Sequence, residues 1–168
     1  MSLYGYFYEE IGNDLWLESQ GSFDDCRLMD VYHAHVETVA LERIPKLFCD
    51  QKSKLRVVIS TIAFGMGVQI PDIEYIIHWG PSENILMYWQ EVGRCARDGR
   101  QGSAILYTPP YSVCKAKSSE QMIQYVQDSE KHCLRKFILK CITTDDMKID
   151  DIDQLCGKQW CCSFCDTI

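Results

Sequence analysis

The chain has 168 residues and a formal net charge of −7 at neutral pH, from 24 acidic and 17 basic side chains. This balance excludes a simple cationic nucleic-acid binder, and no apolar run approaches the length that crosses a bilayer. The length suits one domain with a small appendage. The start, MSLYGYFYEE, lacks the basic residues and apolar block of a secretory signal. We therefore expect a soluble, intracellular protein with no membrane partner.

Charge and cysteines are both unevenly distributed along the chain. Residues 1–50 hold ten acidic and three basic groups, whereas residues 51–168 hold equal numbers of each. Any affinity for phosphate must therefore come from local groups. Three of the ten cysteines lie between Cys161 and Cys165. In a chain of this length without a secretory signal, such clustering favours a metal site over disulfides.

The N-terminal part alternates helical and extended patterns. Leu3–Ile11 is a short aromatic amphipathic stretch that predicts a helix, and Arg27–Tyr32 predicts a brief strand. Val36–Phe48 has apolar residues at helical spacing. Pro45 lies within it and should kink or break the helix, at a cost of about 3 kcal/mol.

Three further strands are predicted, at Lys54–Thr61, Glu74–Trp79 and Gly102–Thr108. The first two are apolar, β-branched runs of the kind that is buried on both faces of a parallel sheet. A helix separates the second strand from the third, and Ser82 is its expected N-cap. Strands that alternate with helices predict an α/β fold with a mostly parallel sheet and flanking helices.

This central helix carries the residues on which the functional interpretation depends. Four apolar residues recur at helical spacing and predict a buried face: Ile85, Trp89, Val92 and Ala96. A second row with the same spacing lies beside it: Gln90, Arg94 and Arg97. Gly99 is the expected end of the helix. Two guanidinium groups and an amide in one row suit a polyphosphate, although a lone RxxR pair is more often a solvated helix face.

The stretch VVISTIAFGMGVQIPDIEYIIHWGPSENILMYWQEVGRCARDG closely resembles the second motor domain of the RecQ family of ATP-dependent DNA helicases, over the family's motifs V and VI. Tyr32-His33-Ala34 resembles the YHA of an earlier motif. The similarity extends from about Leu3 to Asp166. It implies a RecA-like α/β domain over residues 1–110, lacking its N-terminal beginning, and a small helical zinc-binding subdomain over residues 111–168.

The resemblance also implies roles at a nucleotide. Arg97 would be the arginine finger that stabilises charge on the transferred γ-phosphoryl group, with Arg94 beside it. Gln90 would help to couple nucleotide to DNA. The loop AFGMG has glycines that let backbone N–H groups approach a ligand. Its neighbourhood supplies the candidates for nucleotide contact: Gly65, Gly67 and Gln69.

DNA contacts are implied at the end of the Lys54–Thr61 strand. Ser60, Thr61 and Phe64 would lie near the track of the DNA strand, with His78 a weaker candidate. Each has a simpler alternative, because Phe64 can be a core residue, Thr61 can merely end a strand, and His78 can be a packed histidine.

The chain departs from the family pattern at a few positions. Gln69 stands where the family usually has Asn or Asp, and His35 where it usually has Gly. Cys95-Ala96 replaces the usual Ala-Gly. The first departure weakens the expected ribose contact. Together they indicate a divergent member rather than a different fold.

The C-terminal part predicts two helices, Ser112–Gln127 and Glu130–Cys141, followed by a cysteine-rich end. Zinc in structural sites binds four soft ligands such as cysteine thiolates in a tetrahedron, commonly with a CxxC pair among them. The predicted ligands are Cys133, Cys156, Cys162 and Cys165, an order that resembles the RecQ zinc subdomain. Cys161 remains the rival of Cys162, and buried free thiols remain the alternative to a metal site.

Neither a GxxxxGK[ST] phosphate loop nor a DExH box occurs in these residues. The family hydrolyses ATP with Mg²⁺ between two domains, so the resemblance implies that this chain needs a first RecA-like domain in cis and does not turn over ATP alone. We expect part of a longer 3′-to-5′ DNA helicase, or a split gene product. It would act in the nucleus on single-strand/duplex junctions during recombination and repair.

Two other functions stay open. A non-catalytic, zinc-stabilised nucleic-acid-binding or regulatory module is the main alternative, favoured by the missing phosphate loop and the departures at Gln69 and His35. A redox protein using Cys161 and Cys162 is disfavoured, because adjacent thiols lack the activated CxxC setting.

Overall fold

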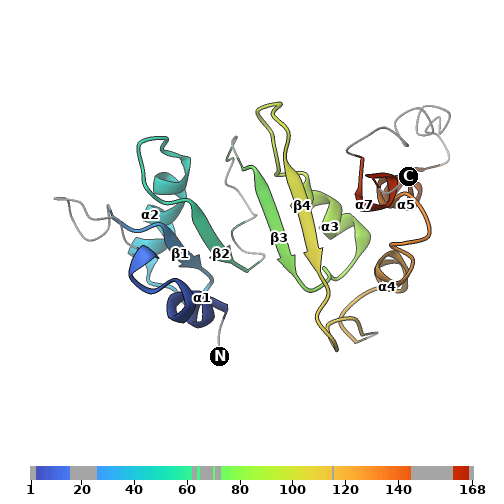
Figure 1. The fold of residues 1–168 in the computed structure, drawn as a ribbon, viewed down its shortest axis with the longest axis horizontal. Coiled ribbons are helices and arrows are strands. Elements are labelled where there is room, and N and C mark those ends of the chain that lie inside the picture. Colours follow the sequence, from blue (N-terminus) through green and yellow to red (C-terminus); the bar gives the residue numbers. More distant parts are fainter. Residues whose placement is uncertain are drawn as a thin grey trace. The chain divides into compact units, whose positions relative to one another are not determined.

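The computed structural model describes residues 3–15, 26–61, 64, 70, 73–114, 116–144 and 161–166. The chain divides into two compact units, Met1–Pro71 and Asp72–Ile168. Each unit contains one parallel pair of strands with a helix between them in sequence (Figure 1). The predicted mixed α/β fold with parallel strands is therefore confirmed. None of the helices in the described ranges combines the length and the apolar character needed to cross a membrane.

The first unit begins with α1, Leu3–Ile11, as predicted, and a 3-10 turn η1, Gly12–Leu15. Strand β1, Met29–Tyr32, pairs in parallel with β2, Val57–Ser60, in a register that runs from Met29 opposite Val57 to Tyr32 opposite Ser60. Helix α2, Thr38–Cys49, connects the two strands.

Pro45 was predicted to kink or break this helix; it lies inside α2 without ending it, so the break is wrong and the kink stays a prediction. Proline removes one backbone donor from the helix, and its ring crowds the carbonyl four residues earlier. The neighbouring Ile44 is fully buried at 0% exposure, and α2 packs against β1. Burial of a side chain of that size stabilises the helix by about 1.5–3 kcal/mol, which offsets the cost of the proline.

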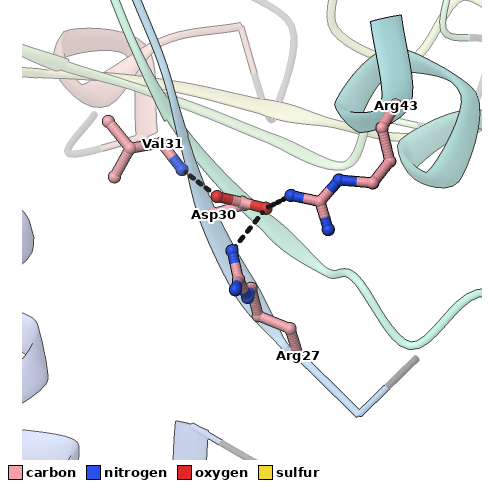
Figure 2. A network of polar contacts seen from close by, with 4 residues as sticks. All are labelled: Arg27, Asp30, Val31 and Arg43. Carbon is pink, nitrogen blue, oxygen red and sulfur yellow. Dashed lines mark hydrogen bonds and ion pairs between the residues drawn. The ribbon is translucent and has the colours of Figure 1, made fainter. Parts of the chain in front are cut away.

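A buried carboxylate ties α2 to β1 (Figure 2). Asp30 on β1 is only 8% exposed. Its Oδ2 accepts hydrogen bonds from Nη1 of Arg27 at 3.0 Å and Nη2 of Arg43 at 3.2 Å, and its Oδ1 accepts from the Val31 N–H at 2.9 Å. Because a buried charge is costly unless it is paired, the two guanidinium groups make this placement tolerable, and Arg43, which belongs to α2, fixes the helix against the strand.

The second unit has the same strand–helix–strand order. Strand β3, Tyr75–Trp79, pairs in parallel with β4, Ser103–Tyr107, in a register that runs from Tyr75 opposite Ser103 to Trp79 opposite Tyr107. Helix α3, Ile85–Val92, lies between them in sequence. Its N-cap is Asn84, whose side chain accepts from the Met87 N–H at 2.9 Å, so the prediction of Ser82 as the cap is wrong. The Ser82 hydroxyl has a different partner, described below.

Three helices follow β4: α4, Glu120–Gln127; α5, Leu134–Ile142; and the short α7, Ser163–Asp166. The predicted helix from Ser112 begins only at Glu120, because Ser119 caps it by accepting from the Met122 N–H at 3.3 Å. Before this cap, Tyr111 has a positive φ of 69°, a conformation that interrupts regular structure.

The core of the second unit joins α3 to the two helices that follow β4. Its buried members are Ile85, Tyr88, Met122, Tyr125 and Ile138. These residues come from both sides of the boundary predicted at residue 110. That boundary stays a prediction, whereas the packing makes α3, α4 and α5 one hydrophobic assembly.

The strands are not buried on both faces, contrary to the prediction. Exposure alternates along β3, where Tyr75, Ile77 and Trp79 are open and Trp79 is 65% exposed. The intervening Ile76 and His78 are half-buried. An apolar, β-branched sequence fits a half-buried strand as well as a fully buried one, so composition alone could not separate the two.

Candidate functional site

The segment with Arg94 and Arg97 is a series of turns, not a helix. Helix α3 ends at Val92, about two turns earlier than the predicted end at Gly99. The N–H groups of Arg94 and Cys95 donate to carbonyl oxygens three residues back, Glu91 at 3.2 Å and Val92 at 3.0 Å. Ala96 then has a positive φ of 53°. The predicted single helical row of Gln90, Arg94 and Arg97 is therefore wrong, although the three residues remain close in sequence.

This arginine turn, residues 93–98, is held against the beginnings of β3 and β4. The Ala96 N–H donates to the Ile73 carbonyl at 2.8 Å. The Cys95 Sγ lies 3.3 Å from the Glu74 carbonyl oxygen and 3.7 Å from that of Ser103. Burial raises the pKa of the Cys95 thiol, which keeps it neutral beside these carbonyls. Cys95 and Ala96, which depart from the family pattern, are thus the residues that anchor the turn.

Gly102 is the residue against which the turn closes. A Cβ added there would lie 2.5 Å from the Cys95 Sγ and 2.9 Å from the Ala96 Cβ. Both distances are shorter than a van der Waals contact. Only glycine, which has no Cβ, therefore fits at this position without displacing the turn. Sequence reasoning did not single out Gly102, and its only signal was its place just after the arginine segment.

The polar groups of the segment differ in their surroundings. Gln90 and Arg97 are exposed, and the Arg97 Nε donates to the Gly93 carbonyl at 3.2 Å. Arg94 is half-buried, and its Nε has no hydrogen-bond partner among the described residues. A buried donor without a partner is costly, and an anionic ligand would satisfy it.

Behind the arginine turn, a carboxylate joins β3, α3 and their connection. Glu91 Oε2 lies 2.9 Å from His78 Nε2 and accepts a hydrogen bond from the Ser82 hydroxyl at 2.5 Å. Burial raises the pKa of the Glu91 carboxyl. The hydrogen bonds from His78 and Ser82 and the charges of His78 and Arg94 outweigh it, so that the pKa is below its ordinary value. The sequence analysis did not select Glu91. The feature that could have indicated it is an acidic residue directly before Val92, which lies on the predicted buried face.

His78 faces the core rather than the surface. Its side chain is 14% exposed, and its ring centroid lies 5.1 Å from that of Tyr88. The structure thus favours the packed-histidine alternative over a contact with DNA.

The other candidate contacts lie in or near the first unit. Ser60, at the end of β2, and Thr61 are exposed, and the Thr61 N–H donates to the Tyr32 carbonyl at 3.2 Å. Phe64 is half-buried, with its ring 4.8 Å from Tyr32 and 6.0 Å from Phe48. It therefore has the contacts of an aromatic cluster. Gly65, Gly67 and Gln69 lie outside the described residues. The roles of all these residues remain predictions.

Four cysteines gather at the start of α5 and around α7. The sulfur atoms of Cys133, Cys161, Cys162 and Cys165 all lie within 4.8 Å of one another. Cys133 Sγ lies 3.6 Å from that of Cys161 and 3.9 Å from that of Cys162. A tetrahedral zinc with Zn–S bonds of about 2.3 Å separates its sulfurs by about 3.8 Å, so this arrangement fits zinc.

The cluster includes both cysteines between which the sequence could not choose. Cys161 and Cys162 lie together in it, and Cys156 lies outside the described residues. Burial and then the neighbouring Cys133 raise the pKa of the Cys161 thiol to about 11. The Cys161 thiol thus resists ionisation by itself, and a bound cation would reverse that preference.

The chain is similar to known helicases. The family model "Helicase conserved C-terminal domain" matches residues 22–99. A putative ATP-dependent RNA helicase of Acanthamoeba polyphaga mimivirus is 30% identical over 145 residues, which are 76% of this chain and 26% of the relative. The ATP-dependent DNA helicase Q-like 2 of Arabidopsis thaliana is 32% identical over 111 residues, which are 64% of this chain and 16% of the relative.

A bacterial relative matches a shorter stretch. The ATP-dependent DNA helicase RecQ of Pasteurella multocida is 37% identical over 79 residues, which are 47% of this chain and 12% of the relative. The chain spans about a quarter or less of the length of these relatives. With the RecQ motifs in its sequence, the parallel strand pairs and the arginine turn, these matches show that the chain belongs to the RecQ family of helicases.

Proposed function

We propose that the chain is the C-terminal part of the motor of an ATP-dependent DNA helicase that moves 3′ to 5′, with Arg97 as its arginine finger. The observation that carries the proposal is the arginine turn, in which an exposed Arg97 and an Arg94 with an unpartnered Nε are held on a segment anchored to two strands. Such an anchored pair of cations suits the charge that develops during phosphoryl transfer.

Each residue would have a distinct task. Arg97 would stabilise the charge on the γ-phosphoryl group of ATP, whose Mg²⁺ is held together with a first RecA-like domain in cis. Arg94 would bind a phosphate oxygen through its partner-free Nε. Gln90, exposed on the last turn of α3, would link the nucleotide state to DNA.

The remaining contacts rest on the family. We assign contact with the nucleotide to Gly65, Gly67 and Gln69, the last two at the ribose. We assign contact with single-strand/duplex junctions to Ser60 and Thr61, whose exposure suits it, and to Phe64. A nuclear role in recombination and repair belongs to the same proposal.

Zinc would hold the C-terminal segment together. Cys133, Cys162 and Cys165 would be three ligands, and either Cys156 or Cys161 the fourth. The sulfur separations support this assignment. Structural zinc contributes on the order of 10 kcal/mol to the folding of small domains, and α7, four residues long, has little packing of its own.

The decisive experiment compares Arg97→Ala with Arg100→Ala in a polypeptide that contains this segment and a first motor domain. Arg100 is the matched control, since it is an exposed arginine of the same segment whose Nε pairs with Asp98 at 2.6 Å. DNA-stimulated ATP turnover should fall by about 10³-fold or more in Arg97→Ala, as expected for an arginine finger, and change little in Arg100→Ala. Retained turnover in Arg97→Ala would refute the finger assignment.

A second function is a non-catalytic, zinc-stabilised nucleic-acid-binding module. The observation that favours it is that α3, α4, α5 and the cysteine cluster form one unit with its own core. Salt-dependent binding of single-stranded DNA by the chain, with no ATP turnover on adding any first motor domain, would favour this function.

A further inference from the structure

The Glu91 carboxylate is the point where three segments of the second unit meet. His78 comes from β3, Ser82 from the connection after it, and Glu91 from the last turn of α3. Both partners reach the same oxygen, Oε2, at 2.9 Å for the His78 Nε2 and 2.5 Å for the Ser82 hydroxyl. The His78 and Glu91 side chains are 14% and 22% exposed. A charge is thus held in a largely enclosed place by two specific partners.

Glu91 is also bonded to the arginine turn through its backbone. Its carbonyl accepts the Arg94 N–H at 3.2 Å, and Val92 and Gly93 separate the two residues. The side chain of Glu91 therefore fixes the end of α3 to β3, while its backbone begins the turn that carries Arg94 and Arg97. A shift of this helix end moves the turn with it, because the turn follows Val92, the last residue of α3, directly.

Fold stability alone does not call for a carboxylate here. Ile85 and Tyr88 already bury α3 against α4 and α5. A partly buried charge is costly even when paired, and apolar residues of similar volume usually serve packing equally well or better. A network of hydrogen bonds does supply what apolar contacts lack, which is a single defined orientation of the helix end.

We propose that Glu91, held by His78 and Ser82, is a positioning residue that sets the orientation of the arginine turn toward the nucleotide. This inference rests on the proposed function of Arg97. It also gives His78 a role through Glu91 instead of a contact with DNA. Glu91 does not touch the substrate, so its effect on turnover passes entirely through the arginines.

A positioning role predicts a specific kinetic pattern. Arg97 acts on charge that exists mainly in the transition state, so poor positioning lowers kcat for ATP and leaves KM nearly unchanged. A displacement of about 1 Å can cost 10²-fold in rate. We therefore expect Glu91→Gln, which keeps the volume and removes the charge, to lower kcat by about 10- to 100-fold. Ser82→Ala should act in the same direction, and Ser82→Thr should restore turnover.

The test measures DNA-stimulated ATP turnover in a polypeptide with both motor domains, for Glu91→Gln, Arg97→Ala and the double variant. If Glu91 acts through the arginine, Glu91→Gln lowers kcat in the wild-type background and has no further effect on the residual turnover of Arg97→Ala. Asp128→Asn is the control for a carboxylate-to-amide change, since Asp128, at the C-cap of α4, pairs with the exposed Lys131 that follows it.

The outcomes separate the two proposals. Full loss in Arg97→Ala with wild-type kcat in Glu91→Gln overturns the positioning role and leaves the finger intact. Equal fold losses from Glu91→Gln in both backgrounds also overturn it, because the effect then bypasses Arg97. Retained turnover in Arg97→Ala overturns the proposed function itself. A lower unfolding midpoint with unchanged kcat per folded molecule makes Glu91 a structural residue only.

Discussion

Replacing Gly102 by alanine should loosen the arginine turn through a direct collision. The added methyl would lie 2.5 Å from the Cys95 Sγ, 2.9 Å from the Ala96 Cβ and 3.1 Å from the Glu74 carbonyl oxygen. Ordinary contact begins near 3.4 Å, so the sulfur must retreat by about 0.9 Å. Retreat would separate Cys95 from the carbonyls of Glu74 and Ser103.

The expected cost follows from overpacking. Inserting a methyl group into a filled site destabilises proteins by about 1–3 kcal/mol. Since Gly102 is itself exposed and part of the turn can yield, we expect about 2 kcal/mol for Gly102→Ala. At a urea m-value of about 2 kcal/mol/M, the unfolding midpoint should fall by about 1 M.

Urea unfolding followed by the fluorescence of Trp79 and Trp89 would measure this loss in the second unit, if Trp16 and Trp160 are first changed to phenylalanine. Combining Gly102→Ala with Cys95→Ala removes the closest contact, so the double variant should be at least about 0.5 kcal/mol more stable than the sum of the single effects predicts. An additive result, or a Gly102→Ala protein as stable as wild type, would refute the close approach of the turn to Gly102.

Three other predictions follow from the contacts described above. Asp30→Asn removes the charge that pairs with Arg27 and Arg43 and should destabilise the first unit by about 2 kcal/mol in thermal unfolding, because both arginines lose their anion; an unchanged midpoint would show the network to be irrelevant. Excess zinc chelator should abolish the helical circular dichroism of the C-terminal segment and leave the strands, and a spectrum that does not change would disprove the zinc assignment. The pKa of Glu91 is lowered on folding, so its stabilising effect should be complete above the ordinary value of 4.5 and decrease as pH falls through the lower folded value; Glu91→Gln should flatten this acid dependence of the unfolding free energy, and an unaltered slope would contradict it.

The strands could be predicted from sequence because their signal is local. The runs Glu74–Trp79 and Gly102–Thr108 differ from β3 and β4 by only a residue at either end. The helix α1 was predicted with the correct bounds for the same reason. Patterns of apolar and β-branched residues within a few positions carry this information.

The end of α3 could not be predicted, because long-range contacts determine it. Gly93 and Gly99 are both reasonable helix ends, and the apolar Ala96 continued the helical pattern. What ends the helix is the bond from the Ala96 N–H to Ile73, a residue 23 positions earlier, together with the space left by Gly102. No short sequence window contains both partners, so the arginine row looked helical.

Choices between adjacent residues failed for a similar reason. Ser82 and Asn84 are both good N-cap residues, and the choice between them depends on Glu91, which takes the Ser82 hydroxyl. Cys161 and Cys162 both reach the sulfur cluster, although spacing to Cys165 favoured only one. The sequence thus predicts that a cysteine cluster exists, whereas the identity of the thiols that lie together is seen only in the structure.

The two parallel strand pairs can form only in sequence order during synthesis of the chain. In both pairs the partners lie 28 residues apart, so each sheet forms only after its own helix has been synthesised. The first pair is complete at Ser60, and the second must wait for Tyr107, which is about 2–9 s of synthesis later at 5–20 residues per second. During that interval the first sheet depends on the contacts within its own unit. The buried Asp30 with its two arginines, and the buried Ile44 of α2, are therefore the contacts on which the first strand pair depends during that interval.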